Sequence, residues 1–301
     1  MTTKEYPFKA FVFEGAGATA FGHFGAVEKF SEKGDLSKIK YFCGSSSGSM
    51  IASVLACGAS LIEVKQELLQ TDFNNFLDDS NGIIPDVYRL FSKWGWYKGE
   101  FIEEWFGNFL QKTIGNKNLT FKELFDKTGN TLIITAVDIT TGTLLYQGKD
   151  TTPDFPIKKA MRRSTSLPLV YKPDVIQEGE ILKYYIDGGC LDNYPIRIFD
   201  NILKPEEVVG FKILNSYGED QDDAVQKIKT PPTSLFDFTA RFLSMMIQKN
   251  NAIHVPEADW QRTVKIKVGK YSSLNFDINL HDKRVMIDAG KVAMEKFLEK
   301  N

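Results

Sequence analysis

The chain has 301 residues and a formal net charge of −2, and hydrophobic residues make up 43% of it. This length and apolar content are sufficient for one large domain or two small ones. The charge balance offers neither a basic excess for nucleic acid nor an acidic tail. Three cysteines without a CxxC pair indicate neither a disulfide framework nor a zinc site, and they favour a reducing, intracellular setting.

Targeting signals are not evident. The opening residues, MTTKEYPFKAFVF, lack the long apolar stretch and small-residue cleavage site of a signal peptide. Nowhere do about 18 apolar residues follow one another without charge, so we expect no membrane-spanning helix. We therefore expect a cytoplasmic protein whose membrane contact is peripheral.

Strand-like and helix-like segments alternate along the chain. Short apolar, β-favouring runs predict strands at 8–13, 39–43, 132–137, 143–146, 182–186 and 208–214. Helical spacing of apolar residues predicts helices at 20–33, 47–57, 61–70, 235–248 and 283–299, and the polar stretch 216–233 is expected to be a surface loop. This alternation indicates an α/β layered domain with a parallel or mixed sheet.

Aromatic residues concentrate in the stretch 88–109. Phe101, Trp105 and Phe109 recur at four-residue spacing, which is typical of a helix face packed on a core. Trp94 and Trp96 flank a glycine and suit either a membrane interface or a lid as well as they suit a core. The apolar helix predicted at 235–248 favours core packing, with the rim of an acyl pocket as the alternative.

A row of three serines, GSSSG, lies between a predicted strand and a predicted helix. A nucleophile elbow has glycine two residues before and two residues after the nucleophile, and Gly44 and Gly48 fit only Ser46. Glycine is needed there because a side chain at either flank of so sharp a turn would collide with the strand or the helix. We therefore predict that Ser46 is a nucleophile; the alternative is a serine-rich turn without chemistry.

A serine needs a base to remove its proton. Asp187 ends a predicted strand and begins the turn DGG, which places it at the edge of the sheet where active sites of open α/β folds form. The histidines have no distinctive surroundings and are interpreted as ordinary surface or core residues: His23, His254 and His281. Asp187 is therefore the preferred base.

Glycines also follow the first predicted strand, in EGAGATAFGHFGAV. Backbone N–H groups exposed in such a turn bind negative charge, either a phosphate or a developing oxyanion. The opening GAGATA fits the loose dinucleotide fingerprint, so a dinucleotide-binding oxidoreductase is a remote alternative. That fingerprint expects an acidic ribose ligand near the end of the second strand, where the chain has Cys43 to Ser46 instead, and Asp35 precedes the strand.

In this order, the three segments resemble the patatin-like phospholipase family over most of the chain up to about residue 200. The flanking stretches AMRRSTSLPLVY and LDNYPI, the latter with Asn193 and Pro195, are similar to the family as well. The resemblance implies a three-layer α/β/α sandwich of patatin type with a mostly parallel or mixed sheet. It also implies a Ser46–Asp187 dyad without histidine. The backbone that it implies for the oxyanion hole is that of Gly15, Ala16, Gly17 and Ala18, and the motif glycines are Gly44, Gly48, Gly188 and Gly189.

The activity implied by the resemblance is calcium-independent hydrolysis of fatty-acyl esters of lipids and phospholipids at a membrane surface, with no cofactor or metal. The expected partner is a membrane lipid or phospholipid and not a nucleic acid; the need for a protein activator is left open. We expect one catalytic domain, 1–301, with the motifs within about 8–200 and a helical part at about 230–300.

The glycine loop departs from the family pattern. Ala16 and Ala20 stand where the family has glycine, and Thr19 stands where it has a basic residue. A lipid-binding protein of the same fold that is catalytically weak or inactive is therefore the main alternative. Arg162 and Arg163 are interpreted as a solvated surface pair, with a charge near the loop as the second possibility.

Overall fold

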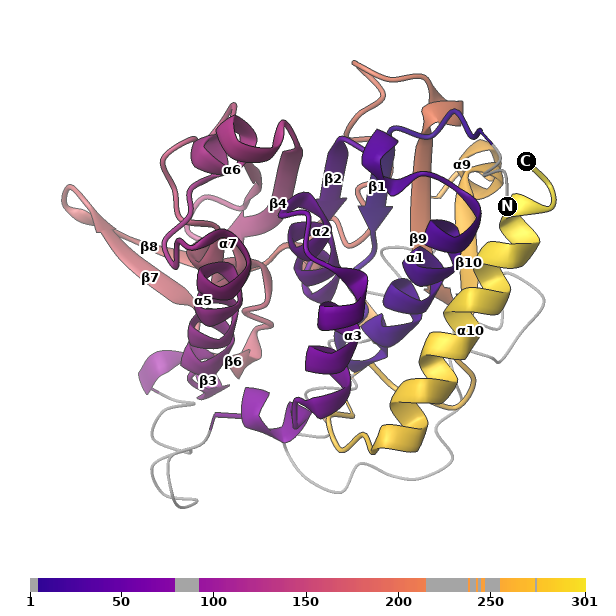
Figure 1. The fold of residues 1–301 in the computed structure, drawn as a ribbon. Helices are drawn as coiled ribbons and strands as arrows, with labels where there is room; N and C mark the ends of the chain where they lie inside the picture. The colour runs from indigo at the N-terminus through magenta and orange to yellow at the C-terminus, as the bar shows by residue number, and fades with distance from the viewer. Residues whose placement is uncertain are drawn as a thin grey trace.

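The protein is built around one mixed β-sheet (Figure 1). The computed structural model describes residues 5–78, 92–214, 238, 242, 245–246, 255–273 and 275–301. Within them, eight strands form the sheet in the order β10-β9-β1-β2-β4-β8-β7, with β5 paired to β4. The strands are β1 (Ala10–Phe13), β2 (Tyr41–Gly44), β4 (Thr131–Asp138), β5 (Thr143–Gly148), β7 (Asp174–Glu178), β8 (Ile181–Asp187), β9 (Val208–Leu214) and β10 (Thr263–Lys267). The pairs from β10 to β4 are parallel, and the pairs β4–β5, β4–β8 and β7–β8 are antiparallel.

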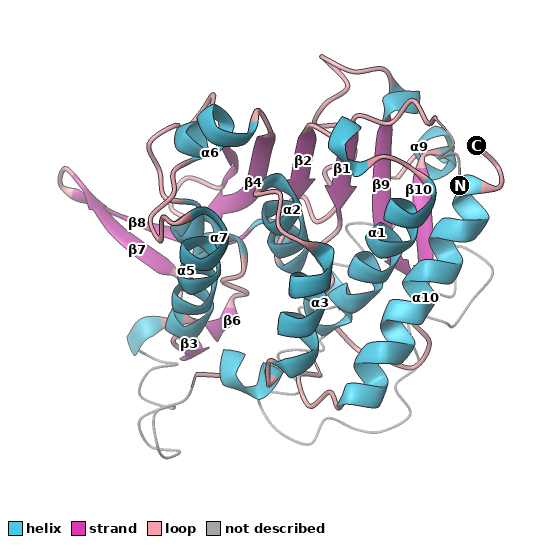
Figure 2. Ribbon diagram, in the orientation of Figure 1, coloured by secondary structure: helices cyan, strands magenta, loops and turns pink. Residues whose placement is uncertain are grey.

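Helices cover the sheet (Figure 2). Their bounds are α1 (Phe21–Lys33), α2 (Ser47–Ala56), α3 (Leu61–Gln70), α5 (Glu100–Ile114), α6 (Phe121–Thr128), α7 (Ile157–Ser164), α9 (Glu257–Gln261) and α10 (Leu280–Leu298). Alternate residues of β1 show the two faces, since Phe11 and Phe13 join the large core and Val12 joins a second one. The second core contains Tyr194, Ile196 and Phe199, and Arg197 of this segment pairs with Asp259 of α9 at 2.7 Å. The fold is a three-layer α/β/α sandwich, which confirms the expectation from the resemblance.

The C-terminal part, which the sequence predicts as helical, also contains a strand. Strand β10 pairs in parallel with β9 before α10 begins. The predicted loop at 216–233 lies outside the described residues. So does most of the predicted helix 235–248, of which the described residues 238, 242, 245 and 246 are helical.

A short two-stranded ribbon, β3 (Gly95–Tyr97) with β6 (Leu169–Tyr171), lies beside the sheet. Arg162 is buried and links the two strands of the ribbon. Its guanidinium donates to the carbonyl oxygens of Lys98 and Lys172, which directly follow these strands; the bond to Lys172 is 2.7 Å long. Arg163 is buried too and pairs with Asp174 at 2.7 Å. The interpretation of these arginines as a solvated surface pair is therefore wrong; their planar groups satisfy buried acceptors.

Candidate active site

The turn between β2 and α2 has the backbone of a strained elbow. Ser46 has φ 50° and ψ −130°, a backbone conformation that residues other than glycine rarely adopt. A Cβ at Gly44 would lie 2.4 Å from the carbonyl carbon of Gly48, and a Cβ at Gly48 would lie 2.4 Å from the carbonyl oxygen of Glu14. Both glycines are therefore required by close backbone approach, as the sequence predicts.

The three serines of this turn differ in what they contact. Ser45 is fully buried and its hydroxyl has no partner among the described residues. Ser47 is buried, and its Oγ accepts a hydrogen bond from the N–H of Ala16 at 3.0 Å. Only Ser46 is partly exposed, and its own N–H is held by the Oγ of Ser164 at 2.9 Å. The side chain of Ser46 therefore faces the cavity while its backbone is fixed.

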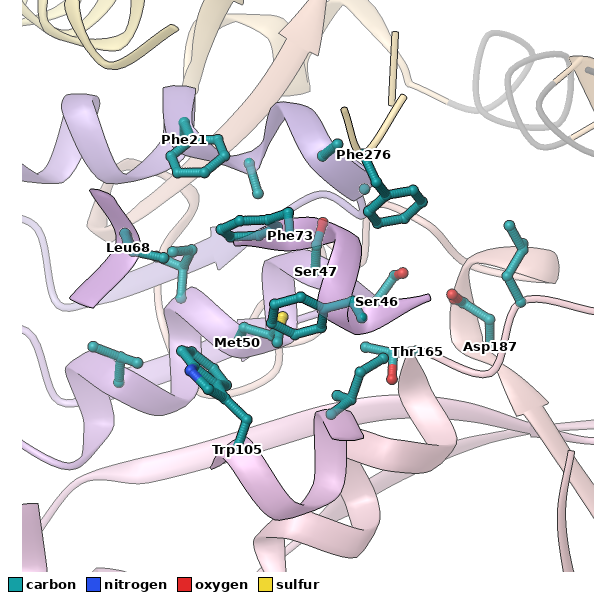
Figure 3. Close-up of a pocket in the computed structure, with 18 of the residues that line it drawn as sticks. Phe21, Ser46, Ser47, Met50, Leu68, Phe73, Trp105, Thr165, Asp187 and Phe276 are labelled. Atoms are coloured by element: carbon teal, nitrogen blue, oxygen red, sulfur yellow. The ribbon is translucent and has the colours of Figure 1, made fainter. Parts of the chain in front are cut away.

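Asp187 ends β8 and faces Ser46 (Figure 3). One carboxylate oxygen accepts from the N–H of Gly189 at 2.7 Å. A Cβ at Gly188 would lie 2.0 Å from Thr135 Oγ1, so the turn needs this glycine. Burial raises the pKa of Asp187 to about 7, although hydrogen bonds from Ser46 and from Gly189 lower it. The structure thus brings the two principal predicted residues together.

The loop after β1 lies directly beside Ser46. A Cβ at Gly15 would come within 3.0 Å of Ser46 Cβ. Three of the four predicted donors are engaged by the protein itself: Gly15 N–H by Asn193 O (3.0 Å), Ala16 N–H by Ser47 Oγ (3.0 Å) and Ala18 N–H by Ser273 O (2.8 Å). The N–H groups of Gly17 and Ser47 have no acceptor among the described residues, and both residues line the cavity. Gly17 has φ 51°, which favours glycine.

Thr19, which stands where the family has a basic residue, does not reach the cavity. It is buried, and its hydroxyl donates to the carbonyl oxygen of Ala16 at 2.7 Å. This bond fastens the short turn Gly17–Ala20 that follows the loop. The departure at this position therefore serves the loop's own structure.

A buried polar cluster supports the loop from beneath. The carboxylate of Glu14 pairs with Lys212 and accepts from the N–H of Ile213 at 2.9 Å. Burial raises the pKa of Glu14, and the ammonium group of Lys212 opposes that rise. Asn193 Nδ2 donates to Gly15 O at 2.8 Å and lies 3.5 Å from Glu14. No role for Glu14 is predicted from the sequence; the feature that could have indicated one is a lone carboxylate at the end of an apolar strand.

The cavity in front of Ser46 is apolar and opens to solvent. Of the described residues that line it, Asp187 and Glu67 are acidic and none is basic. The apolar lining comes from α2 (Met50, Ile51, Val54), α3 (Val64, Leu68), α5 (Trp105, Phe109) and Phe276, and Figure 3 shows several of these side chains around Ser46.

Neither described histidine lines the cavity. His23 is buried with Nε2 3.0 Å from the carbonyl oxygen of Glu14, and burial lowers its pKa to about 4. His281 is exposed at the start of α10, and His254 lies outside the described residues. Among the described residues, no group of three His, Cys, Asp or Glu side chains could hold a metal ion. None of the described helices is long and apolar enough to cross a bilayer.

Comparison with known sequences places the site in context. A family model described as patatin-like phospholipase matches residues 11–200. An uncharacterised protein of Acanthamoeba polyphaga mimivirus is 28% identical over 288 residues, which are 95% of this chain and 92% of that protein. A probable lipid hydrolase of invertebrate iridescent virus 6 is 29% identical over 196 residues, 64% of this chain and 63% of that one.

Solved structures share the fold. VipD from Legionella pneumophila superposes with a TM-score of 0.65 at 17% identity, over 99% of this chain and 69% of VipD. Full-length ExoU of Pseudomonas aeruginosa, solved in complex with SpcU, gives 0.53 at 18% identity, over 98% of this chain and 54% of the matched chain. At such identities the likeness concerns the fold alone.

Proposed function

The chain belongs to the patatin-like phospholipase family, and from this premise we propose that it is a serine acyl hydrolase acting on fatty-acyl esters of lipids, phospholipids included. Family membership and the similarity to a probable lipid hydrolase support lipid hydrolysis in general. The observation that carries the finer proposal is that the Ser46 side chain and the buried Asp187 carboxylate face each other at one apolar cavity. The base has a pKa of about 7, suited to accepting and returning a proton near neutral pH.

In the first half-reaction, Ser46 Oγ attacks the ester carbonyl carbon and its proton passes to the carboxylate of Asp187. The carbonyl oxygen becomes an oxyanion. We assign its stabilisation to the N–H groups of Gly17 and Ser47, because the other loop donors are already engaged. Ser47 begins α2, so the helix dipole adds to the favourable field.

The tetrahedral intermediate then collapses. The bond between the carbonyl carbon and the alkoxy oxygen breaks, and Asp187 returns its proton to the leaving alcohol. The acyl group remains on Ser46. A water molecule attacks this ester, Asp187 takes its proton and passes it to Ser46 Oγ, and the fatty acid leaves. Each proton is accounted for within the dyad, so we expect full activity in the presence of a chelator.

The substrate class follows from the cavity. Among the described residues, its lining offers an acyl chain apolar side chains along α2, α3 and α5 and no cation to hold a charged group inside. We therefore place the acyl chain in the cavity and the polar part of the lipid at the mouth. A substrate of this kind is supplied by a lipid surface, so the proposal includes peripheral membrane contact.

The test is fatty-acid release from phospholipid vesicles by the purified full chain. We expect release by the wild type, none by Ser46→Ala, and release close to wild type by Ser45→Ala, the matched control from the same turn. Persistence of hydrolysis in Ser46→Ala overturns the assignment. A wild type that binds lipid, releases no fatty acid and does not react with a fluorophosphonate would instead be the inactive lipid-binding protein.

A further inference from the structure

Two residues with exposed apolar side chains have a strained backbone conformation. Apart from Ser46, the non-glycine residues with positive φ in the described part of the chain are Trp94 (φ 61°) and Leu169 (φ 65°). Their exposed fractions are 59% and 41%. Strain of this kind persists where the surroundings enforce it, and it is a recognised mark of functional segments. Exposing a large apolar residue at such a position is doubly unfavourable in water.

The two residues are neighbours in the β3–β6 ribbon. Gly95, directly after Trp94, is the register partner of Leu169. Leu167 and Val170, on either side of Leu169, line the cavity in front of Ser46. In Figure 1 the ribbon lies at the end of the molecule toward which β1 and β2 point, which is the end where Ser46 follows β2. Trp94 and Leu169 therefore lie at the same end of the molecule as the cavity, next to ribbon residues that line it.

The ribbon is held from behind by buried contacts. Arg162 donates to backbone carbonyl oxygens on both of its chain segments, those of Lys98 and Lys172. A Cβ at Gly95 would lie 2.0 Å from the N–H nitrogen of Lys172, so the segments touch backbone to backbone. These contacts fix the ribbon's position and leave the two apolar side chains facing outward.

The ribbon's own residues carry charge of one sign, while an acidic side chain binds at its end, where Asp78 accepts from the N–H of Gly99. Residues 92–99 and 167–172 contain three lysines and no acidic residue. Lys172 pairs with Glu100 at 2.6 Å, and Lys93 next to Trp94 is exposed. Apolar and aromatic side chains flanked by lysine suit the boundary between acyl chains and anionic headgroups.

We propose that Trp94 and Leu169 form a membrane-docking tip that inserts into a lipid bilayer and sets the mouth of the cavity against it. The proposal rests on the proposed function, because a docked ribbon would serve to supply lipid to that cavity. The Trp94 indole suits the interface because its ring is apolar and its N–H can meet the headgroup layer. The docked tip lets an acyl chain pass from bilayer to cavity without crossing water.

Substitution by glycine separates docking from structure. Glycine adopts positive φ without strain, so Trp94→Gly and Leu169→Gly should leave the melting temperature unchanged or raise it by about 2 °C. Loss of the apolar side chain should weaken vesicle binding about tenfold or more. Leu169→Asn, which also tolerates positive φ, provides a second variant should the glycine form fail to fold.

The experiment is vesicle sedimentation of the full chain in a Ser46→Ala background, with phosphatidylcholine vesicles containing phosphatidylglycerol. The matched control is Ile202→Ala: Ile202 is 61% exposed and follows Phe199, which packs on Tyr41 at the opposite end of β2 from Ser46. We expect the tip variants to lose binding and the control to keep it. In the Ser46-containing protein, the tip variants should hydrolyse vesicle lipid more slowly but a water-soluble butyrate ester at the wild-type rate.

Vesicle binding by folded tip variants equal to that of the parent overturns the proposal, and so does an equal loss on vesicles and on the soluble ester. Tip-dependent binding by a wild type that releases no fatty acid would leave docking intact and refute the proposed function. The two claims therefore fail separately.

Discussion

At the scale of single residues, Ser45, Ser46 and Ser47 have the same side chain in three different environments. Ser46 has the hydroxyl that faces the cavity, and its position between two glycines could be predicted from spacing alone. The function of Ser47 could not, because its Oγ meets the N–H of Ala16, which is 31 residues away in the chain. The row of identical side chains does not distinguish Ser45 from Ser47, whereas their contacts in the structure do.

Ser47→Ala should be more harmful than Ser45→Ala. The first leaves the buried N–H of Ala16 without an acceptor, at a cost of about 1–3 kcal/mol, and loosens the loop that contains Gly17. The second removes a hydroxyl that has no described partner, so its cost should be below about 1 kcal/mol. Urea unfolding and ester hydrolysis of both variants measure this; equal effects would show that the Ala16 contact does not support the loop.

Asp187→Asn should be inactive and yet more stable at alkaline pH. The pKa of Asp187 is about 7 in the folded protein against an ordinary 3.8, so the folded chain keeps a proton that the unfolded chain has released. The stability that Asp187 contributes is fully present below pH 3.8, its ordinary pKa. It falls as the pH rises from there and is lost above about pH 7. Asparagine does not ionise, so the variant escapes this loss.

Urea unfolding of wild type and Asp187→Asn at several pH values checks the sign. The difference in the free energy of unfolding should be near zero at about pH 4 and should reach up to about 4 kcal/mol in favour of the variant at about pH 8. A variant that is less stable than wild type at about pH 8 would mean that Asp187 is not held in a desolvated site.

At the scale of elements, the loop after β1 and the turn after β8 meet at one residue, Asn193, whose backbone carbonyl accepts from Gly15 N–H and whose side chain adds a second contact. Asn193 donates to Gly15 O at 2.8 Å, and a Cβ at Gly189 would lie 2.5 Å from its Oδ1. The loop carries the proposed oxyanion donor Gly17, and the turn carries Asp187. Asn193 is thus a positioning residue between two halves of the site.

Asn193→Ala should lower kcat about 10²-fold with a smaller change in KM, because the loop and the turn lose the side-chain part of their link and the reacting groups move apart. Asn193→Asp is the matched variant: it keeps the shape but replaces the Nδ2 donor with an acceptor next to Gly15 O. It should therefore be no better than alanine. A kcat within about twofold of wild type in both variants would refute the positioning role.

The elements that the sequence predicts well are those with strong apolar patterns. The segment LIITAV lies in β4, and VVGFKIL forms β9. A strand precedes GSSSG and a helix follows it, as the sequence predicts. The sequence does not predict β3 and β6, which form the separate ribbon. Nor does it predict β7 (DVIQE) and β10 (TVKIK), which lie at the two edges of the sheet, where polar residues are tolerated. The sequence predicts the oxyanion donors only as a group of four. It cannot tell which N–H groups are already engaged, because their acceptors belong to Asn193, Ser47 and Ser273, which are distant in sequence.

At the scale of the whole molecule, the C-terminal part is joined to the motif-bearing part by close packing. Strand β10 extends the sheet through β9, and α10 crosses α1 at two glycines. A Cβ at Gly25 would lie 1.9 Å from Ile287 O, and a Cβ at Gly290 would lie 1.9 Å from Gly22 O. We therefore propose that the chain unfolds as one domain, as the sequence predicts.

Gly290→Val should lower the stability of the whole protein and not of the C-terminal part alone. The branched side chain forces α10 away from α1 and should cost about 1–3 kcal/mol, the range for overpacking. The nearby exposed change Val292→Ala on the same helix is the control. Circular dichroism and tryptophan fluorescence should report one shared transition shifted to lower temperature; two separate transitions would indicate two domains.

The central claim is that Asp187 activates Ser46 without help from a histidine. The most direct measurement is the rate of Ser46 modification by a fluorophosphonate as a function of pH, read by intact mass and peptide mapping. For the wild type, the rate should rise with pH and be half-maximal near 7, the pKa of Asp187. For Asp187→Asn it should be at least about 10²-fold slower and nearly flat, whereas His254→Ala and His281→Ala should follow the wild type. Labelling of Asp187→Asn at the wild-type rate, or an equal loss in either folded histidine variant, would contradict the dyad.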